Sequence, residues 1–527
     1  MERASRINLQ DVLCLVGILV LAIVTRLPGL ALRGQWDADQ GNELLVLLHW
    51  VRDGQVPLLG PSTFAGTFHH GALYYYLLAP AAFLTDVDPH AIVLTITILG
   101  LATVAAIWAL GYAVGGPWTG HVAGVLAAAS PALVLGSTFI WNPNPVPLGA
   151  ALALLGAVLA WTRYSARWWL LAAVGCTLAM QLHVSGGLLV PPLLLAWVLD
   201  LARRPTGERS TVLLAGLGGA AIVAAGYLPL LVHELETGFT DTQGLVGYLR
   251  GGMGVGASGD LVTRMLVVAF RSLAWPFTGV ITEAPLASAA VTVVVILLLG
   301  VALRGGGNQA RPALVLFTGT LLWSLPALAL TAPTLLSAVP GLPNDHYHTY
   351  LDPLVLVVAA TGIAAAAGYV GRFVDPRASG GRRESRLVGR GLGLAALVVL
   401  VAVSVWRWPP ASAEDGGWPL ADEAAVRLIA GQDVPALTLV SLPEVKSPDA
   451  IRFPLERGGA VPLAPVAGED PPGGVILVCD PLFADLMGAR CGGEAELAYA
   501  THAGTGRVPL DRFTAGARRT ITVLPAQ

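Results

Sequence analysis

Long apolar runs alternate with short polar segments over the first three quarters of the chain. An α-helix needs about 20 predominantly apolar residues to cross the hydrocarbon core of a bilayer. We therefore predict about 11–13 transmembrane helices. The clearest runs lie at about 10–32, 89–113, 118–138, 145–163, 167–183, 185–201, 211–232, 286–303, 311–331, 350–371 and 391–407. Two further runs fit less well, because residues 71–86 are short and residues 261–277 carry two arginines.

The pattern changes near residue 408, where the chain becomes richer in Pro, Gly, Asp and Glu. A helical run at Asp422–Ala430 and β-like runs at 436–441, 474–479 and 520–524 follow, separated by turn residues. We predict two domains, a transmembrane domain at 1–407 with a first outer loop at 33–70, and a soluble domain at 408–527. The expected fold class is an all-α polytopic membrane protein with a small C-terminal extracytoplasmic α/β domain.

Composition agrees with a membrane protein and narrows the possible partners. Hydrophobic residues make up 55% of the 527 residues and charged residues only 12%, whereas soluble globular domains have about 25% charged residues. Lipid must therefore be the solvent for much of the surface. A net charge of −3 argues against nucleic acid as a partner.

Arginine placement predicts the orientation, because basic loops stay on the cytoplasmic side. Arg3 and Arg6 precede the first apolar run, and Met1 to Arg6 leads into it without a signal-peptide cleavage site. Further basic loops lie around 163–167, 203–209, 304–311 and 372–390. An odd number of crossings is then required between residues 71 and 162. We expect the short run at 71–86 to be a surface or re-entrant segment. This puts the N-terminus in the cytoplasm, and the 33–70 loop and the C-terminal domain outside the plasma membrane.

An oxidising outer compartment permits a disulfide between Cys479 and Cys491. Two unpaired, partly buried thiols are the alternative. Cys14 and Cys176 lie in apolar runs and are expected to be inert core thiols.

The first outer loop carries the most informative polar residues. Asp37 and Asp39 follow the first apolar run, and an amphipathic helix begins after them, with leucines on one side and polar residues on the other. We expect this helix to lie in the membrane interface. His69, His70 and the aromatic cluster around Tyr75 come next. Ordinary surface charges on a solvated loop are the alternative interpretation.

Other polar groups fall at the same predicted outer level, and ionisable groups beside membrane spans are functional candidates by default. A histidine at a helix end also fits a structural role, so this placement alone does not decide. If the predicted orientation holds, one outward-facing cavity could collect all of them. These residues are Arg26, Asn142, His183, His346 and His348.

The order of motifs in this region resembles the GT-C membrane glycosyltransferases. An arginine ends the first helix in VTRLPGL, and an acidic pair, an amphipathic helix ending in Asp-Gly, a Pro-Leu turn and the segment GALYYYLLAP follow. The resemblance is strongest to the protein O-mannosyltransferase and lipid A aminoarabinose transferase group, a family-39-like set of enzymes. It covers about residues 20–200, and the Asp-His-Tyr-His before the 350–371 run matches more loosely.

The resemblance implies transfer of a sugar from a polyprenyl-phosphate-linked donor to an acceptor hydroxyl on the outer face, with inversion. The family uses the first acid of the loop as general base, and Asp39 matches that position. Gln40 stands where the family usually has a second acid, and His70 stands where it has a lysine segment. One carboxylate can deprotonate a hydroxyl, and guanidinium groups bind phosphate well. Arg26, Arg264 and Arg271 are the candidates for the phosphate, although the last two also fit snorkelling at an interface.

Three questions remain open from the sequence. A polytopic transporter or lipid flippase is the alternative function, but it needs polar groups near the bilayer midplane. A non-catalytic membrane scaffold is a third. No cofactor is predicted; Asp37, Asp39, His69, His70 and His346 could in principle hold a divalent metal, but we expect no essential one. The sugar (mannose, arabinose or another) is not specified, nor is the acceptor, which could be a cell-envelope glycan, lipid or protein.

Overall fold

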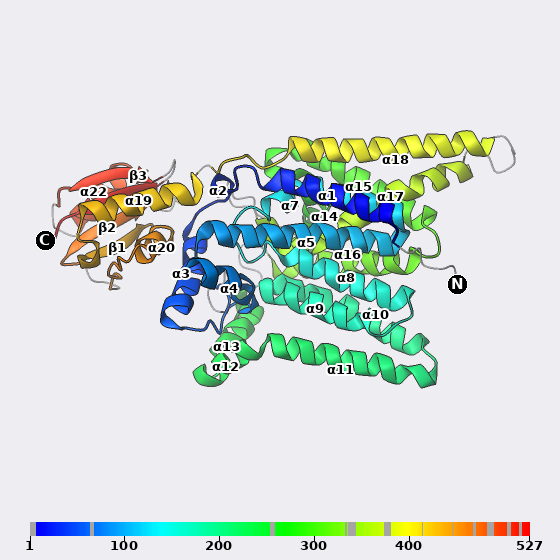
Figure 1. Cartoon of the computed structure of the whole chain (residues 1–527), viewed down its shortest axis with the longest axis horizontal. Coiled ribbons are helices and arrows are strands. Elements are labelled where there is room, and N and C mark those ends of the chain that lie inside the picture. Colours follow the sequence, from blue (N-terminus) through cyan, green and yellow to red (C-terminus); the bar gives the residue numbers. More distant parts are fainter. Residues whose placement is uncertain are drawn as a thin grey trace.

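A computed structural model shows a long bundle of helices with a small sheet at one end (Figure 1). The structure describes residues 7–63, 68–252, 259–332, 335, 344–373, 381–413, 415–444, 446–466, 471–481, 490–502, 507–515 and 519–526. The N-terminal end of α1 lies at the end of the bundle away from the sheet. The sheet therefore caps the opposite end of the bundle.

Most predicted spans correspond to helices. The bundle contains α1 Leu9–Arg26, α5 Pro89–Gly115, α6 Pro117–Ala129, α7 Pro131–Leu135, α8 Val146–Thr162, α9 Trp168–Leu182, α10 Val190–Arg203, α11 Arg209–Gly226, α14 Leu261–Thr278, α15 Pro285–Gly305, α16 Arg311–Thr331, α17 Asp352–Phe373 and α18 Gly381–Trp406. Among the described residues, eight helices are long and apolar enough to cross a membrane, and α4, α8 and α9 are shorter apolar helices. The chain is thus a multi-pass, largely helical membrane protein.

Two predicted spans are interrupted by proline. The 118–138 run is divided into α6 and α7 at Ser130, whose backbone is extended before Pro131. The residue before a proline avoids the α region, so a helix ends there. The 211–232 run is divided after Gly226, and α12 (Leu228–Thr237) begins with Pro229 in its first turn. A short helix, α13 (Thr240–Gly247), follows α12.

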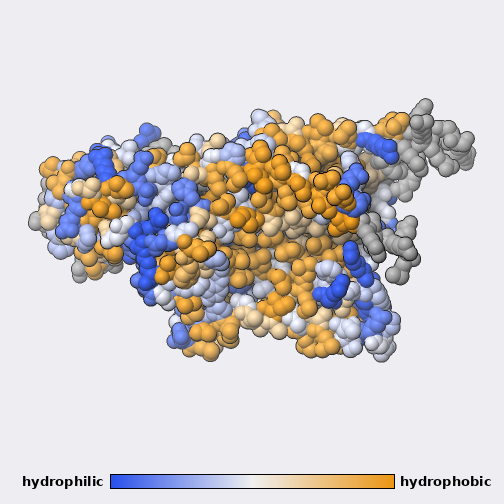
Figure 2. Space-filling model, viewed as in Figure 1, coloured by the Kyte–Doolittle hydropathy of each residue, from blue (hydrophilic) through white to orange (hydrophobic). Residues whose placement is uncertain are grey.

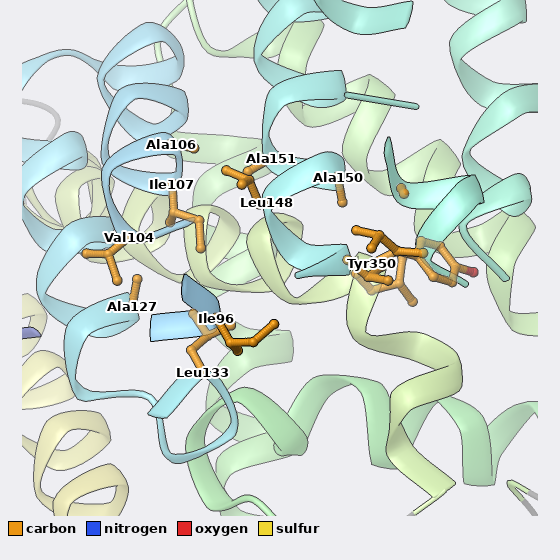
Figure 3. Close-up of a cluster of buried hydrophobic side chains, with 14 of the residues drawn as sticks. Ile96, Val104, Ala106, Ile107, Ala127, Leu133, Leu148, Ala150, Ala151 and Tyr350 are labelled. Carbon is orange, nitrogen blue, oxygen red and sulfur yellow. The ribbon is translucent and has the colours of Figure 1, made fainter. Parts of the chain in front are cut away.

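The bundle core is built from small and branched apolar side chains. Figure 3 shows a cluster of buried side chains that includes Val104, Ala127 and Ala151, from α5, α6 and α8, and at its other side Tyr350 of the 3₁₀ helix η6 (Asn344–Leu351). The α8–α9 pair is especially close, since a Cβ on Gly156 would come within 2.3 Å of the Ala172 backbone nitrogen. Small residues at such positions let membrane helices approach closely.

The outer surface of the bundle is apolar, as a lipid-facing surface should be. Figure 2 shows hydrophobic residues spread over the helices, with hydrophilic residues gathered at the junction with the sheet and at the far end of the bundle. Leu286 is 86% exposed and Leu217 is 68% exposed. Monomeric soluble proteins rarely expose such a large apolar surface to water, whereas contact with lipid is favourable for it.

Three helices lie at the sheet end of the bundle in and beside the 33–70 segment: α2 Leu30–Arg33, α3 Ala38–Asp53 and α4 Leu73–Thr85. α3 is the predicted amphipathic helix, and Gly54, at φ +72°, ends it in the left-handed conformation that glycine adopts without strain. α4 has 13 residues, or about 20 Å of helix, which is too short to span a bilayer core alone. It packs against α3, α5 and α9.

The C-terminal region, defined here as residues 415–526, contains the four-stranded sheet with order β1-β2-β4-β3. Its elements are α19 Gly417–Gly431, β1 Leu437–Leu442, α20 Asp449–Arg457, β2 Gly474–Cys479, α22 Glu494–His502, β3 Asp511–Ala515 and β4 Arg519–Leu524. β1 pairs with β2 in parallel, and β4 is antiparallel to both of its neighbours. Cys479 and Cys491 form a disulfide. Strand β3 was not predicted from the sequence.

The C-terminal region is docked on α3. Trp36 donates a hydrogen bond from its indole nitrogen to the Ala450 carbonyl at 2.8 Å, and its ring contacts the rings of Trp418 and Phe453. A Cβ on Gly41 would lie 2.1 Å from the Asp449 carbonyl oxygen. The backbones of α3 and α20 therefore meet directly at this glycine.

Candidate functional site

The beginning of α3 is fixed by hydrogen bonds of Asp37 and Gln40. Asp37 is the N-cap residue, and its carboxylate accepts a hydrogen bond from the Ala38 amide at 2.7 Å. Gln40 completes the capping box by accepting from the Asp37 amide at 2.9 Å, and its amide group donates to the Ile140 carbonyl at 2.8 Å. Gln40 thus caps the helix and ties it to the 140–142 segment.

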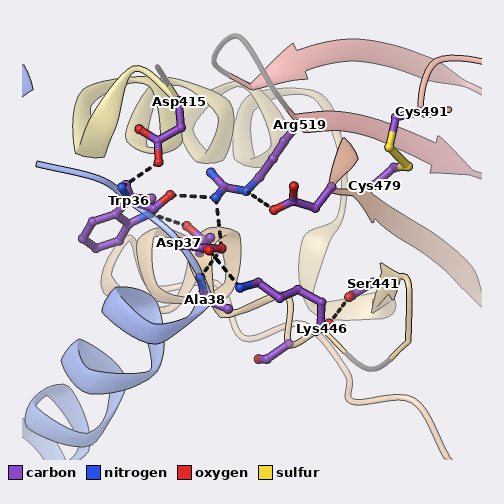
Figure 4. Close-up of polar contacts among 12 residues, drawn as sticks. Trp36, Asp37, Ala38, Asp415, Ser441, Lys446, Cys479, Cys491 and Arg519 are labelled. Carbon is purple, nitrogen blue, oxygen red and sulfur yellow. Dashed lines mark hydrogen bonds and ion pairs between the residues drawn. A yellow bond between two sulfur atoms is a disulfide. The ribbon is translucent and has the colours of Figure 1, made fainter. Parts of the chain in front are cut away.

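Asp37 is buried and held by two cations from the C-terminal region (Figure 4). The Lys446 ammonium lies 2.8 Å and the Arg519 guanidinium 3.2 Å from its carboxylate oxygens. Burial alone would raise the pKa of Asp37, but the charges of Lys446 and Arg519 outweigh it and leave the pKa below its ordinary value. Asp37 is a permanently charged anchor, which makes it a poor proton acceptor.

Asp39 lies in the opposite situation. Its side chain is exposed on α3, and no described residue hydrogen-bonds its carboxylate. Crowding by surrounding protein raises the pKa of Asp39, the Lys446 charge opposes this rise, and the Asp37 charge adds to it. An accessible carboxylate with a raised pKa is suited to accept a proton.

A hollow of about 500 Å³ lies beside the same face of α3. Asn42 and Val46, one and two turns after Asp39, are part of its wall. The 56–62 segment, His69, Tyr75 and His233 form the rest. Ligand cavities in proteins typically measure about 300–1,000 Å³, so the hollow is large enough for a small ligand.

Glu43 lies on the buried side of α3, and the sequence analysis did not select it. The Tyr74 hydroxyl donates a hydrogen bond to its carboxylate, and the Asn142 backbone also hydrogen-bonds it. Burial raises the pKa of Glu43 to about 8, the Tyr74 and Asn142 hydrogen bonds oppose the rise, and the Asp39 charge adds to it. Glu43 is therefore largely protonated at neutral pH.

Three candidate histidines from separate parts of the chain, His70, His183 and His346, lie close together. The ring centroids of His70 and His183 are 4.7 Å apart, and those of His183 and His346 are 5.2 Å apart. Burial lowers the pKa of His70 to about 3 and holds the pKa of His183 well below its ordinary value. These two imidazoles are neutral and can act as hydrogen-bonding groups only. Trp141 packs edge-on against the His346 ring.

His69 faces away from this cluster. Its Nδ1 atom lies 2.9 Å from the Asp241 carboxylate of α13, and its amide donates to the same side chain at 2.7 Å. Asn142 donates from its side chain to the Leu182 carbonyl at 2.6 Å. His69 thus ties the first loop to α13, and Asn142 ties the segment after α7 to the end of α9.

The candidate arginines are in different environments. Arg26 is fully buried and donates to Ser137 and to the Ala128 carbonyl. Arg271 forms a two-pronged ion pair with Asp345 at 2.8 and 2.7 Å. His348 contacts the same carboxylate at 2.9 Å. Arg264 is half-buried near the start of α14 and donates to the Gly259 carbonyl. Arg26 and Arg271 therefore already hydrogen-bond to other protein groups.

Two further features bear on the site. Among the described residues, no three His, Cys, Asp or Glu side chains converge in a way that could hold a metal ion.

Four residues near the site were not predicted from the sequence: Lys446, Arg519, Glu43 and Tyr74. Only Glu43 had a local signal, because it lies four residues before Leu47 and so shares a helix face with an apolar residue.

Comparison with known proteins places this geometry in a family context. Residues 69–228 match the family model "Dolichyl-phosphate-mannose-protein mannosyltransferase". No curated protein matches the sequence at a significant level. The structure is similar to ArnT from Cupriavidus metallidurans in the apo state, with 11% identity and a TM-score of 0.60. It is also similar to ArnT bound to undecaprenyl phosphate, with 12% identity and a TM-score of 0.61. Each match covers 97% of both chains.

The arabinofuranosyltransferase AftD from mycobacteria has a TM-score of 0.52 and 16% identity, covering 99% of this chain and 40% of AftD. The resemblance inferred from the first loop is confirmed by these matches, as is the predicted fold class of a helical membrane protein with a small C-terminal α/β domain. The chain therefore has the fold of the GT-C membrane glycosyltransferases, and its residues 69–228 are similar in sequence to the protein mannosyltransferases among them.

Proposed function

We propose that this protein transfers a sugar from a polyprenyl-phosphate-linked donor to an acceptor hydroxyl at the outer face of the plasma membrane, with Asp39 as general base. The observation that carries the proposal is the accessible carboxylate of Asp39, which no described residue hydrogen-bonds and which lies one helical turn before Asn42 in the wall of the 500 Å³ hollow. The fold and the match of residues 69–228 supply the reaction class. ArnT was observed with undecaprenyl phosphate, which supports a lipid-linked donor.

The chemistry follows from the positions of the groups. The donor's sugar phosphate would occupy the hollow next to Asn42, His69 and Tyr75. Asp39 would take the proton of the acceptor hydroxyl while the hydroxyl oxygen of the acceptor attacks the anomeric carbon. The phosphate leaves from the opposite side, so the anomeric centre is inverted. Phosphate is a good leaving group, and the base on the acceptor is the main catalytic requirement.

The alternatives receive less support. A transporter or flippase would require polar groups along a path across the bundle. The groups described here, from Asp39 to the His70–His183–His346 cluster, gather instead at the bundle end that faces the sheet. We propose, accordingly, that the C-terminal region is an extracytoplasmic domain over this site, with its boundary near residue 408.

Replacement of Asp39 tests the proposal. Purified protein in detergent is incubated with undecaprenyl-phosphate-linked mannose or arabinofuranose and a delipidated cell-envelope fraction, and released undecaprenyl phosphate is measured by mass spectrometry. We expect Asp39→Asn to lower release by about 100-fold or more, because general-base catalysis contributes about 10²–10⁴-fold. Asp53→Asn, an exposed acid on the same helix, is the matched control and keeps full activity. Full release by folded Asp39→Asn protein would refute the mechanism and favour a non-catalytic scaffold.

A further inference from the structure

The C-terminal region places one amine directly at the start of α3. Lys446 is the only lysine in the chain. Its ammonium lies 2.8 Å from the Asp37 carboxylate, and its side chain is only 17% exposed. Figure 4 shows Lys446 reaching from the loop after β1 toward Asp37 at the first turn of α3. The charge of Lys446 also acts on Asp39, two residues further along the chain.

The loop that carries Lys446 is held in place by hydrogen bonds. The Lys446 amide donates to the Pro443 carbonyl at 2.9 Å, and the Ser441 hydroxyl donates to the Lys446 carbonyl. The neighbouring Asp449–Arg457 helix, α20, packs on α3 at Gly41. The ammonium is therefore preorganised, and it costs little conformational entropy to hold it at α3.

Asp37 does not need Lys446 as its only cation. Arg519 binds the other Asp37 oxygen at 3.2 Å, donates to the Trp36 carbonyl at 2.7 Å and lies 3.5 Å from Asp480. Asp37 is also fixed as the N-cap of α3. Arg519 already pairs with the Asp37 carboxylate, so the docking of the C-terminal region on α3 does not require Lys446 as a second cation. The same charge also acts on Asp39, two residues after Asp37, which has no hydrogen-bonding partner among the described residues.

We propose that Lys446 is a positioning residue through which the C-terminal region completes the active site, its charge keeping Asp39 ionised and available as the base. This inference rests on the proposed function of Asp39. The charged groups that act on Asp39 are Lys446 and Asp37, and Asp39 acts in turn on Glu43 one turn later. Because Lys446 opposes the rise in the pKa of Asp39, loss of its charge would leave more of the base protonated at a given pH.

The single lysine permits a test without mutation. Acetic anhydride removes the charge of an amine, whereas reductive dimethylation keeps it. Lys446 and the chain's α-amine are the amines that react, and hydroxylamine reverses any acetylation of tyrosine hydroxyls. We measure the pH profile of undecaprenyl phosphate release from the same donors. Acetylation is expected to move the acid limb upward by about one pH unit, and dimethylation is expected to leave it in place. Intact mass confirms the number of modified amines.

Matched variants separate this role from a structural one. Lys446→Met is expected to reproduce the shifted limb, and Lys446→Arg to restore the original profile. Acetylated Lys446→Met protein measures the effect of the α-amine alone. Arg427→Met removes an exposed cation from the same region, where Arg427 pairs with Asp511, and should not move the limb.

The outcomes also distinguish the two proposals. An acid limb that stays in place in both acetylated protein and Lys446→Met overturns the inference, even if activity falls equally at every pH. That result, combined with an inactive Asp39→Asn variant, would leave the proposed function standing. Activity in Asp39→Asn protein would instead refute the proposed function itself.

Discussion

Two acids at the start of α3, Asp37 and Asp39, have different surroundings, and this difference decides their roles. Asp37 is buried, caps α3 and is paired with two cations, whereas Asp39 is accessible and crowded but unbonded among the described residues. The sequence predicts that both lie at the outer end of the first helix. It could not predict which acid is paired, because the pairing residues lie more than 400 positions away in the chain.

Glu43 gives a prediction for stability at the residue scale. Its pKa is about 8 in the folded protein against an ordinary value of 4.5. The folded state therefore keeps a proton that the unfolded state releases between these values, and folding stability falls as pH rises through this window. Each pH unit in the window costs about 1.4 kcal/mol. Glu43→Gln mimics the protonated form and should remove this part of the slope.

The measurement is the midpoint of thermal unfolding in detergent at pH 5, 6.5 and 8. The difference between Glu43→Gln and the unmodified protein should grow in favour of the variant toward pH 8. Asp53→Asn serves as the control on the same helix, where the acid is exposed. Parallel curves for Glu43→Gln and unmodified protein would show that Glu43 is ionised when folded.

At the scale of elements, the contact between α3 and α20 depends on one glycine. A Cβ at Gly41 would lie 2.1 Å from the Asp449 carbonyl oxygen, and backbone cannot move aside as a flexible side chain can. We expect Gly41→Ala to push the C-terminal region off α3. Limited proteolysis should then cleave between α18 and α19 faster, and transfer activity should fall by about tenfold or more, as expected for a misplaced active-site group.

Gly431→Ala is the matched control, because a Cβ there meets nothing within 4 Å and the residue ends α19 of the same region. It should leave both proteolysis and activity unchanged. Equal protease resistance in Gly41→Ala and unmodified protein would mean that the two helices can separate slightly without loss of docking.

Element prediction succeeded where hydrophobicity alone controls the structure. The run at 311–331 corresponds to α16 and the run at 474–479 to β2, because an uninterrupted apolar run leaves few alternatives. It failed where a local break overrides the run, as at Ser130 before Pro131. Strand β3 was missed because its exposure alternates over only five residues and it pairs with β4 alone.

At the scale of the whole molecule, the orientation remains a prediction from arginine placement. It puts Gln55, after α3, outside the cell and Gly207, between α10 and α11, in the cytoplasm. Figure 1 shows these segments at opposite ends of the bundle. In cells that express Gln55→Cys, a membrane-impermeant maleimide should label the protein directly. Gly207→Cys should react only after the cells are permeabilised, and both positions are exposed.

The unmodified chain measures the background labelling: Cys479 and Cys491 are joined and Cys176 is buried, so half-buried Cys14 is its main source. The reverse pattern of labelling would place the Asp39 site in the cytoplasm. A polyprenyl-linked donor would then have to be presented on the inner leaflet.

The contact between Arg519 and the Trp36 carbonyl joins residues that are 483 positions apart in the chain. A ribosome makes these two residues at opposite ends of synthesis, at about 5–20 residues per second. The segment around Trp36 is therefore made roughly half a minute or longer before its partner. Nascent or truncated chains carry Asp39 but lack Lys446 and Arg519, the cations that pair with Asp37 at the start of its helix. If Asp39 is the base, as proposed, an unfinished chain would lack the contacts that complete the site.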